Sequence, residues 1–518
     1  MSRYSGILMP MSSLPSKHGI GTMGKEAYAF VDFLEKSGQK YWQLLPLGPT
    51  SYGDSPYQSF STFAGNPYYV DLDLLVEEGL LTEAEVSAPD WGSNPERTDY
   101  GKIYESRFAV LRKAFERGWA SHQEEVQKFR QENSSWLENY ALFMAVKAHF
   151  NMVSWTEWPD EGIRRHTWDA VRRYQEELKD DVNFYVFIQY LFFKQWNELR
   201  DYAHEREIEF IGDLPIYVAL DSADVWSEPN FFYLDDENRP IMVAGVPPDA
   251  FNEDGQLWGN PLYDWDAMAR DGYGWWIRRV DGASKLFDMI RIDHFLGFLA
   301  YYCIPAESKT ARVGEWREGV GMKLLSVLIS WFPKLKFIAE DLGFVSDQLK
   351  QLRENTGWPG MKILEFGFDV KGESDYMPHN CVPNSVCYIG THDNQTVKGW
   401  LPDLNEETLE YARDYMHITE DEGWCWGMIR AGMSSPAGLF VAQMQDVLEL
   451  EADARMNTPG TASGNWQWRM KPGSLTEELA EKLYHYTWTY RRLAVVPEPE
   501  EEDEEVMTVK LTAEIKAR

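Results

Sequence analysis

Short apolar runs bounded by turn residues recur along this chain, and longer stretches with helical spacing separate them. Buried parallel strands read as continuous apolar runs, and their crossover connections are usually helices. The alternation therefore predicts a parallel sheet covered by helices. A chain of 518 residues can form an α/β barrel with insertions as one catalytic unit. The predicted fold class is a (β/α)8 TIM barrel.

The candidate barrel strands are the runs at 6–14, 41–49, 209–218, 287–295, 336–343, 361–368, 385–393 and 439–447. The last of these runs, LFVAQMQDV, fits the start of a helix equally well. We expect the barrel to occupy residues 1–495.

Roughly 150 residues separate the second and third predicted strands, far more than one crossover helix requires. This segment, 55–205, is therefore predicted to be an insertion in the barrel. Its apolar residues follow helical spacing at 104–115, 136–150 and 182–196, so we expect it to be mostly α-helical. The last of these helices is apolar on several faces, which predicts that it is buried against the barrel.

A second long connection, 221–281, is rich in Pro, Gly, Asn and Trp and has little periodicity. We interpret it as an ordered active-site loop region. The segment 496–518 begins with the acidic run PEPEEE and is predicted to be a flexible tail. We expect no all-β domain at the C-terminus.

The formal net charge of -33 argues against nucleic acid and anionic membrane surfaces as partners, because both are negatively charged. A neutral substrate tolerates such a surface, and the 22 Trp, 27 Tyr and 26 Phe offer faces that pack against sugar rings or simply fill a core.

The four cysteines lack metal-ligand spacing and are expected to be free thiols. The first residues resemble no signal peptide and no apolar run is long enough to span a membrane, so we expect a cytoplasmic location.

Carboxylates stand at the ends of four predicted strands: Asp213, Asp293, Glu340 and Asp393. Because strand ends on the C-terminal face of a barrel converge on one cavity, these side chains are expected to meet. Cleavage of a glycosidic bond with retention needs one carboxylate as nucleophile and a second carboxyl about 5–5.5 Å away as acid/base. The sequence offers both kinds of group.

The neighbouring residues suggest a catalytic role for each carboxyl group. Arg291 lies two residues before Asp293, so both side chains share one face of the strand and the guanidinium favours the ionised carboxylate. Glu340 follows an apolar strand, where desolvation raises a carboxyl pKa and keeps it protonated. Asp393, beside His392, is placed to bind sugar hydroxyls in an oxocarbenium-like transition state.

Other interpretations remain open for each position. Carboxylates at strand ends often cap the following helix, and residues 392–394 fit an Asx turn. Their occurrence together on successive strands favours catalysis. A metal-dependent hydrolase is a weaker alternative, because no H-x-x-x-H spacing, Cys/His cluster or EF-hand loop is present. We therefore expect no metal and no cofactor.

The motifs RIDHF (291–295), AEDLG (339–343) and GTHDN (390–394) resemble the catalytic strands of the α-amylase superfamily. Longer segments at 51–69, 211–218, 245–265 and 465–470 resemble the amylomaltase, or disproportionating-enzyme, family of 4-α-glucanotransferases. The resemblance runs from about Tyr4 to Tyr490. It implies Asp293 as nucleophile, Glu340 as acid/base and Asp393 as transition-state stabiliser.

The same resemblance implies a set of substrate-binding residues. Tyr57 is expected to stack on the sugar at the cleavage site, with Asp213, Arg291 and His392 around that sugar. Asp249, Phe251 and Trp258 are expected in a loop over the acceptor side, and Phe366 and Asn465 as further lining residues. Ordinary packing is an alternative for Tyr57, Phe251 and Trp258.

The implied function is 4-α-glucanotransferase activity, in which a segment of a 1,4-α-D-glucan donor moves to the 4-hydroxyl of an acceptor glucan or glucose. One alternative is an α-glucan hydrolase of the α-amylase superfamily with the same carboxylates. Another is a non-catalytic glucan-binding protein on a decayed barrel, although binding alone requires no matched set of carboxylates. The sequence makes no prediction of protein partners.

Overall fold

A computed structural model describes residues 3–51, 53–248, 252–343 and 346–495 of the chain. Parallel strands close into a barrel in the order β1-β12-β11-β10-β9-β6-β3-β2. They are β1 (Tyr4–Leu8), β2 (Tyr41–Gln43), β3 (Glu209–Pro215), β6 (Met289–Asp293), β9 (Lys336–Ala339), β10 (Gly360–Ile363), β11 (Ser385–Tyr388) and β12 (Leu439–Gln443). The chain is a (β/α)8 TIM barrel, as predicted.

Each predicted apolar run overlaps one barrel strand, although the strands are shorter than the runs and β1 and β10 begin just before theirs. Most runs continue past the strand into loops at its carboxyl end, where buried apolar side chains persist after the ladder hydrogen bonds stop. The last run, 439–447, forms both a strand and the start of a helix, the two structures that its sequence fits. Its first half is β12, and the helix α18 (Met444–Val447) follows directly.

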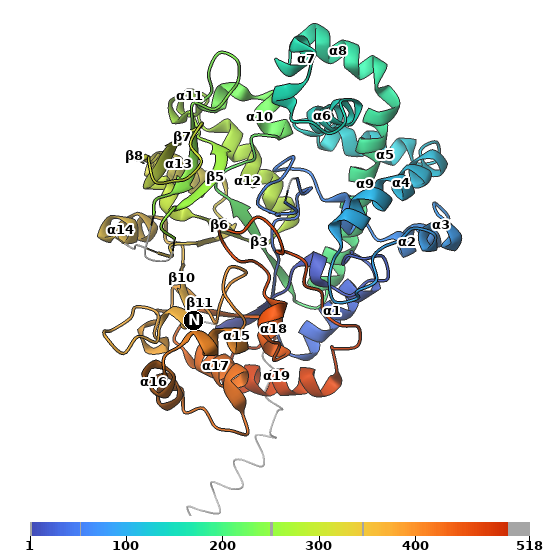
Figure 1. Cartoon of the computed structure of the whole chain (residues 1–518). Coiled ribbons are helices and arrows are strands. Elements are labelled where there is room, and N and C mark those ends of the chain that lie inside the picture. Colours follow the sequence, from blue (N-terminus) through green and yellow to red (C-terminus); the bar gives the residue numbers. More distant parts are fainter. Residues whose placement is uncertain (1–2, 52, 249–251, 344–345, 496–518) are drawn as a thin grey trace, which may run out of the picture.

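Helices surround the barrel: α1 (Lys25–Lys36), α12 (Gly274–Leu286), α13 (Met322–Trp331), α14 (Asp347–Thr356), α17 (Gly423–Ser434) and α19 (Glu477–Thr489) (Figure 1). Local chemistry sets their ends. In α14 the Ser346 hydroxyl accepts a hydrogen bond from the Leu349 N–H, which caps the first turn. Gly357 ends the same helix at a φ of 73°, a conformation that glycine adopts without steric cost.

The insertion after β2 is helical, as predicted. It contains α2 (Leu72–Glu77), α3 (Glu83–Ser87), α4 (Tyr100–Gly118), α5 (Gln123–Glu132), α6 (Leu137–His149), α7 (Glu161–Arg164), α8 (Trp168–Glu177) and α9 (Lys179–His204). These helices gather on one side of the barrel, in blue to teal at the right of Figure 1. The three predicted helical segments correspond to α4, α6 and α9.

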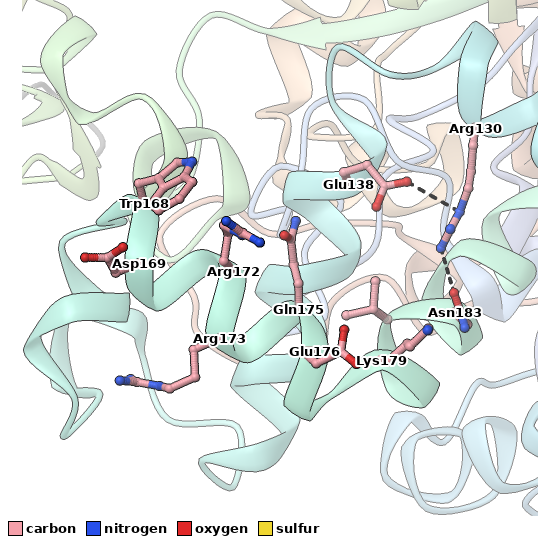
Figure 2. Close-up of a pocket in the computed structure, with 11 residues that line it drawn as sticks. Arg130, Glu138, Trp168, Asp169, Arg172, Arg173, Gln175, Glu176, Lys179 and Asn183 are labelled. Carbon is pink, nitrogen blue, oxygen red and sulfur yellow. Dashed lines mark hydrogen bonds and ion pairs between the residues drawn. The ribbon is translucent and has the colours of Figure 1, made fainter.

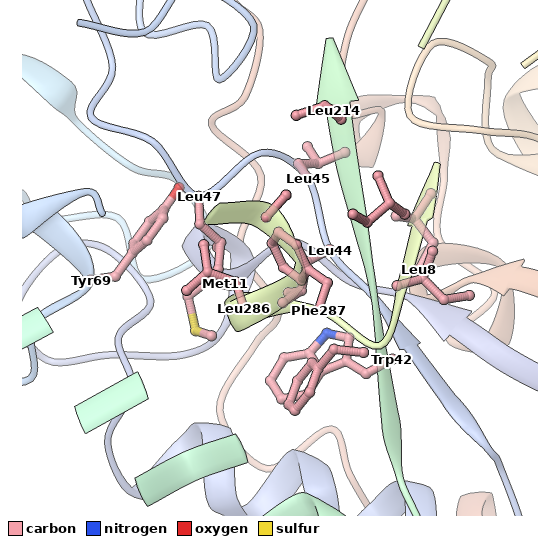
Figure 3. Packing of buried hydrophobic residues seen from close by; sticks show 14 of the residues in the cluster. Leu8, Met11, Trp42, Leu44, Leu45, Leu47, Tyr69, Leu214, Leu286 and Phe287 are labelled. Atoms are coloured by element: carbon pink, nitrogen blue, oxygen red, sulfur yellow. The ribbon is translucent and has the colours of Figure 1, made fainter. Parts of the chain in front are cut away.

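The helix α9 joins the insertion to the barrel and leads into β3. Its Trp196 ring lies 4.9 Å from Phe210 and 6.0 Å from Phe287, between ring centroids. Phe210 in turn contacts Trp42 of β2 at 5.4 Å. Figure 3 shows Trp42 and Phe287 within this packed cluster. The expected burial of α9 against the barrel is confirmed.

The region 221–281 contains more regular structure than its composition indicated. It includes α10 (Ala223–Ser227), β4 (Met242–Val246), β5 (Gln256–Pro261) and α11 (Trp265–Arg270). A small antiparallel sheet, β5-β4-β7-β8, adds β7 (Ala300–Pro305) and β8 (Glu315–Glu318) from beyond that region. The sequence did not reveal this sheet, because a register shift at Val243/Gly245 interrupts the alternation on which strand prediction depends.

After β12, no strand occurs in residues 444–495, the last stretch that the structure describes. The predicted tail, 496–518, lies outside the described residues. All four cysteines are buried free thiols, as expected. Across the described parts of the chain, every helix is too short or too polar to cross a bilayer.

Two buried glutamines of α9 hold the chain that enters the insertion. Gln189 donates to the Gly65 carbonyl at 2.7 Å and accepts from the Gly65 N–H at 2.8 Å. Gln195 makes the same pair of bonds to the backbone of Asp71, at 3.1 and 2.7 Å. Each side-chain amide thus replaces a strand partner for one buried peptide unit.

We predict that Gln189→Leu lowers the free energy of unfolding by about 2–4 kcal/mol, because both backbone groups of Gly65 lose their buried partner. Urea unfolding followed by circular dichroism measures the change. Gln131→Leu, at an exposed position of α5, is the matched control and is expected to leave the midpoint unchanged. Equal midpoints for the two variants contradict the anchoring role.

Candidate active site

Strand register brings the predicted carboxylates to one end of the barrel. Asp213 of β3 pairs with Arg291 of β6, and Pro215 pairs with Asp293. Ile292 of β6 pairs with Ala339 of β9, so that Glu340 begins the loop beside Asp293. Backbone bonds continue this alignment, since the Glu340 N–H donates to the Ile292 carbonyl at 3.0 Å.

Arg291 joins two of these carboxylates. Its Nη1 donates to both oxygens of Asp213, at 2.7 and 2.8 Å, and to Oδ1 of Asp293 at 3.0 Å. The side chain of Arg291 is only 4% exposed and that of Asp213 is fully buried, whereas that of Asp293 is 28% exposed. Burial raises the pKa of Asp213, and Arg291 opposes this shift. The contact expected from strand alternation is therefore present, and Asp293 is the more exposed of the two aspartates that Arg291 contacts.

Tyr57 and His392 lie against the same group. The Tyr57 hydroxyl donates to Asp213 at 2.7 Å and lies 2.9 Å from Nε2 of His392. The two rings are stacked, with centroids 5.1 Å apart and planes at 25°. Trp466 packs on both rings, at 5.8 Å from Tyr57 and 5.9 Å from His392. These contacts gather side chains from three distant parts of the sequence around Asp213.

Glu340 has the environment of a proton donor. Burial raises its pKa to about 7, and the opposing influence of Arg291 is smaller than this desolvation. Two backbone N–H groups fix the carboxyl in place, from His294 at 2.7 Å and from Leu342 at 2.9 Å. His294 adopts a φ of 54° directly after Asp293, and this turn aims its N–H at Glu340. The sequence expectation of a raised pKa is met.

Asp393 is held by two residues that the sequence analysis did not identify. The Asn457 amide donates to Oδ1 of Asp393 at 2.6 Å, and Arg455 donates to its backbone carbonyl at 2.6 Å. Asn457 also donates its backbone N–H to the His392 carbonyl at 3.1 Å. The segment around Asn457 reads as an ordinary polar loop, so sequence pattern alone gave no signal for either residue.

Of the remaining predicted substrate-binding residues, one lies beside the site, two make contacts elsewhere, and two lie outside the described residues. Trp258 of β5 lies edge-to-face with His294, at 4.9 Å between ring centroids, and so stands beside the site. Phe366 is 48% exposed and packs on Tyr376, without a contact to the catalytic carboxylates. The Asn465 side chain bonds Thr458 and Thr461 of its own loop. Asp249 and Phe251 lie outside the described residues. The substrate roles of all five remain predictions.

Metal chemistry has no evident support in this site. In the parts of the chain that the structure describes, no group of three or more His, Cys, Asp and Glu side chains is arranged to hold a metal ion. The cations nearest to the carboxylates are the guanidinium groups of Arg291 and Arg455. Proton transfer and nucleophilic attack are the chemistry that this set of side chains can perform.

The fold and the site together define a class of protein. A TIM barrel whose strand ends present one carboxylate in contact with an arginine, and beside it a desolvated carboxyl with a raised pKa, has the two groups of a retaining glycosidic-bond enzyme. The surroundings of the two groups differ, because Asp293 contacts a guanidinium whereas desolvation raises the pKa of Glu340.

Comparison with known proteins identifies the family. The family model described as 4-alpha-glucanotransferase matches residues 9–476. The 4-alpha-glucanotransferase of Clostridium butyricum is 48% identical over 486 residues, which cover 93% of this chain and 100% of that protein. The enzyme of Streptococcus pneumoniae strain TIGR4 is 49% identical over 493 residues, 95% of this chain and 98% of that protein.

A solved structure agrees in fold and sequence. Amylomaltase from Streptococcus agalactiae, determined in complex with acarbose, has a TM-score of 0.93 and 42% identity and covers 95% of this chain and 100% of that chain. The chain belongs to the 4-alpha-glucanotransferase family. Its activity is that of a 4-α-glucanotransferase, as the sequence motifs implied.

We predict that the rate of transfer declines as pH rises through about 7, because the raised pKa of Glu340 means that its proton is lost there. The measurement is the pH profile of kcat/KM with maltotriose. A maltosyl fluoride donor is the control, since fluoride leaves without needing a proton from the protein. The alkaline decline is expected to disappear in glycosyl transfer from that donor to the enzyme. An identical decline with both donors contradicts the assignment of Glu340 as acid.

We predict that Asn457→Ala lowers kcat about 10- to 100-fold with little change in KM, because Asp393 loses a charge-assisted hydrogen bond. Steady-state transfer from maltotriose measures both constants. Asn355→Ala, at an exposed position of α14, is the control and is expected to behave as the unchanged chain. A variant that changes KM alone indicates that Asn457 acts in ground-state binding instead.

Proposed function

We propose that this chain moves a segment of a 1,4-α-D-glucan from a malto-oligosaccharide donor to the 4-hydroxyl of glucose or another glucan, through a covalent glucosyl-enzyme intermediate. The observation that carries the proposal is the pairing at the ends of β6 and β9. There Asp293 contacts Arg291, while desolvation raises the pKa of Glu340 to about 7. One group is thus suited to attack and the other to give a proton.

In the first step Asp293 attacks the anomeric carbon of the donor, and the bond to the glycosidic oxygen breaks. Glu340 gives its proton to that oxygen, so the leaving glucan departs with a free 4-hydroxyl. The sugar is now joined to the Asp293 carboxylate with inverted configuration, and Glu340 is ionised.

In the second step the 4-hydroxyl of an acceptor gives its proton to Glu340 and attacks the same anomeric carbon. The ester bond to Asp293 breaks, and a new α-1,4 bond forms with retention of configuration. Glu340 is protonated again and Asp293 is free, so atoms and charge balance over the cycle. Water in place of the acceptor gives hydrolysis.

The surrounding residues are proposed to bind and polarise the sugar at the cleavage site. Asp393, oriented by Asn457, is suited to accept hydrogen bonds from ring hydroxyls as positive charge develops on the anomeric carbon. Tyr57 offers an aromatic face, with His392 and Asp213 behind it. Arg291 is proposed to hold Asp213 in place and to orient the Asp293 carboxylate for attack.

Transfer instead of hydrolysis is proposed to depend on the segment 245–265. Trp258 stands at the edge of the site against His294, where an aromatic ring can hold an acceptor glucose and exclude water. Asp249 and Phe251, which the family resemblance places in this segment, are proposed to contact glucose units as well. Phe366 and Asn465 are proposed as outer contacts.

A cytoplasmic location is part of the proposal. The four cysteines are all buried free thiols, which suits a reducing compartment. A substrate pool of short and long glucans in the same compartment provides both donor and acceptor.

The test is incubation of the purified chain with maltotriose while oligosaccharide length and free reducing ends are followed over time. Longer and shorter products at constant reducing ends are the expected result. A steady rise in reducing ends supports the hydrolase alternative, and a mixture that stays unchanged with longer donors too supports a non-catalytic glucan-binding protein.

We predict that Asp293→Ala abolishes transfer and that Glu340→Gln reduces it roughly a thousandfold, while both variants keep the unfolding midpoint of the original chain within experimental error. Both side chains are assigned for chemistry and not for packing. Asp281→Ala, at an exposed helix position, is the matched control for a lost carboxylate. Full transfer by folded Asp293→Ala contradicts the nucleophile assignment.

A further inference from the structure

An open groove of about 740 Å³ lies within the helical insertion, outside the catalytic cleft. All of its lining residues come from the helices α5, α6, α8 and α9, and none comes from the barrel. Figure 2 shows Trp168, Arg172 and Gln175 along α8 on one side, and Arg130, Glu138 and Asn183 on the other. The barrel mechanism uses none of these side chains.

Trp168 is the most exposed tryptophan among the described residues, with 68% of its surface accessible. A large aromatic ring in water is costly unless it has a partner to bind. The Arg172 guanidinium lies 4.8 Å from the ring centroid, which steadies the indole and still leaves most of it open. Trp168, Arg172 and Gln175 follow the i, i+4, i+7 spacing of one helix face, about 10 Å long.

Planar polar groups lie across the groove from Trp168, Arg172 and Gln175. Arg130 donates from Nη2 to Asn183 at 2.8 Å, and its Nε lies 3.4 Å from Glu138. This leaves further N–H groups of Arg130, the amide N–H groups of Asn183 and the carboxylate of Glu138 available in a fixed arrangement. The side chain of Gln175 makes no hydrogen bond with the other described residues and adds a free amide. The groove therefore offers both donors and acceptors.

The chemistry of the groove selects a class of ligand. Its four basic and three acidic side chains nearly balance, which disfavours a polyanion such as nucleic acid. Only Trp168 and Val182 are apolar, too few for the face of an amphipathic helix. A neutral ligand with flat apolar faces and a rim of hydroxyl groups matches both the indole and the polar groups. A chain of pyranose rings has this character.

We propose that this groove is a second binding site for an α-glucan chain, with Trp168 as the stacking platform and Arg130, Glu138, Gln175 and Asn183 as partners for sugar hydroxyls. The choice of α-glucan among saccharides rests on the proposed function. A polymer held there stays tethered to the protein, so its ends reach the catalytic cleft at a raised effective concentration. Short oligosaccharides are released after each turnover, so binding in the groove does not raise their concentration at the catalytic cleft.

The test measures retention of the full chain in native gels that contain amylopectin, with the Glu340→Gln background so that the polymer is not altered. Trp168→Ala is expected to weaken retention roughly fivefold or more, and Gln175→Leu to weaken it in the same direction. The control is Trp331→Ala, whose ring is 63% exposed on α13 and lies outside the groove. Retention of Trp168→Ala equal to that of Trp331→Ala overturns the proposal.

A second readout uses catalytically intact chains. Trp168→Ala is expected to raise KM for long amylose severalfold and to leave kcat/KM for maltotriose unchanged. An equal loss on both substrates overturns the proposal, because it indicates damage to the cleft. The proposed function is tested separately by maltotriose transfer in the original chain. Absence of that transfer together with Trp168-dependent retention refutes the catalytic proposal and leaves the second site standing.

Discussion

The buried guanidinium of Arg291 is the interaction on which the site depends. It supplies the single positive charge between Asp213 and Asp293, and its side chain is only 4% exposed. Asp213 is fully buried beside this cation, and removal of the cation from such a buried pair costs about 3–5 kcal/mol because the carboxylate is left unpaired. Through Asp213 the same network reaches Tyr57 and His392. The sugar site is thus built around one ion-pair cluster.

Glu340 lies in different surroundings. Desolvation raises its pKa to about 7, and the backbone N–H groups of His294 and Leu342 hold it without supplying a full charge. Neighbouring strand ends therefore place their carboxyl groups in different surroundings, although both are at the rim of one barrel. This difference comes from the partner and not from the residue type. It allows one fold position to provide a nucleophile and the next to provide an acid.

Regular local patterns carried most of the fold prediction. Continuous apolar runs bounded by turn residues identified the barrel strands, and helical spacing identified α4, α6 and α9. The insertion could be inferred from length alone, because a crossover needs only one helix. The small sheet β5-β4-β7-β8 could not be inferred, since β4 pairs with the distant β7 and the β4–β5 pairing contains a register shift. The groove beside Trp168 has no sequence signature either, because its walls come from four helices.

The sequence by itself determined which residues can do chemistry: Asp293 and Arg291 share a strand face because side chains alternate, and Glu340 follows an apolar strand that buries it. These are short-range consequences of chain geometry. Only the tertiary structure decided that Asn457 and Arg455 orient Asp393, and that Tyr57 reaches Asp213 across 156 positions of sequence. Such contacts depend on how loops from separate strands close over the barrel, and no local pattern encodes that closure.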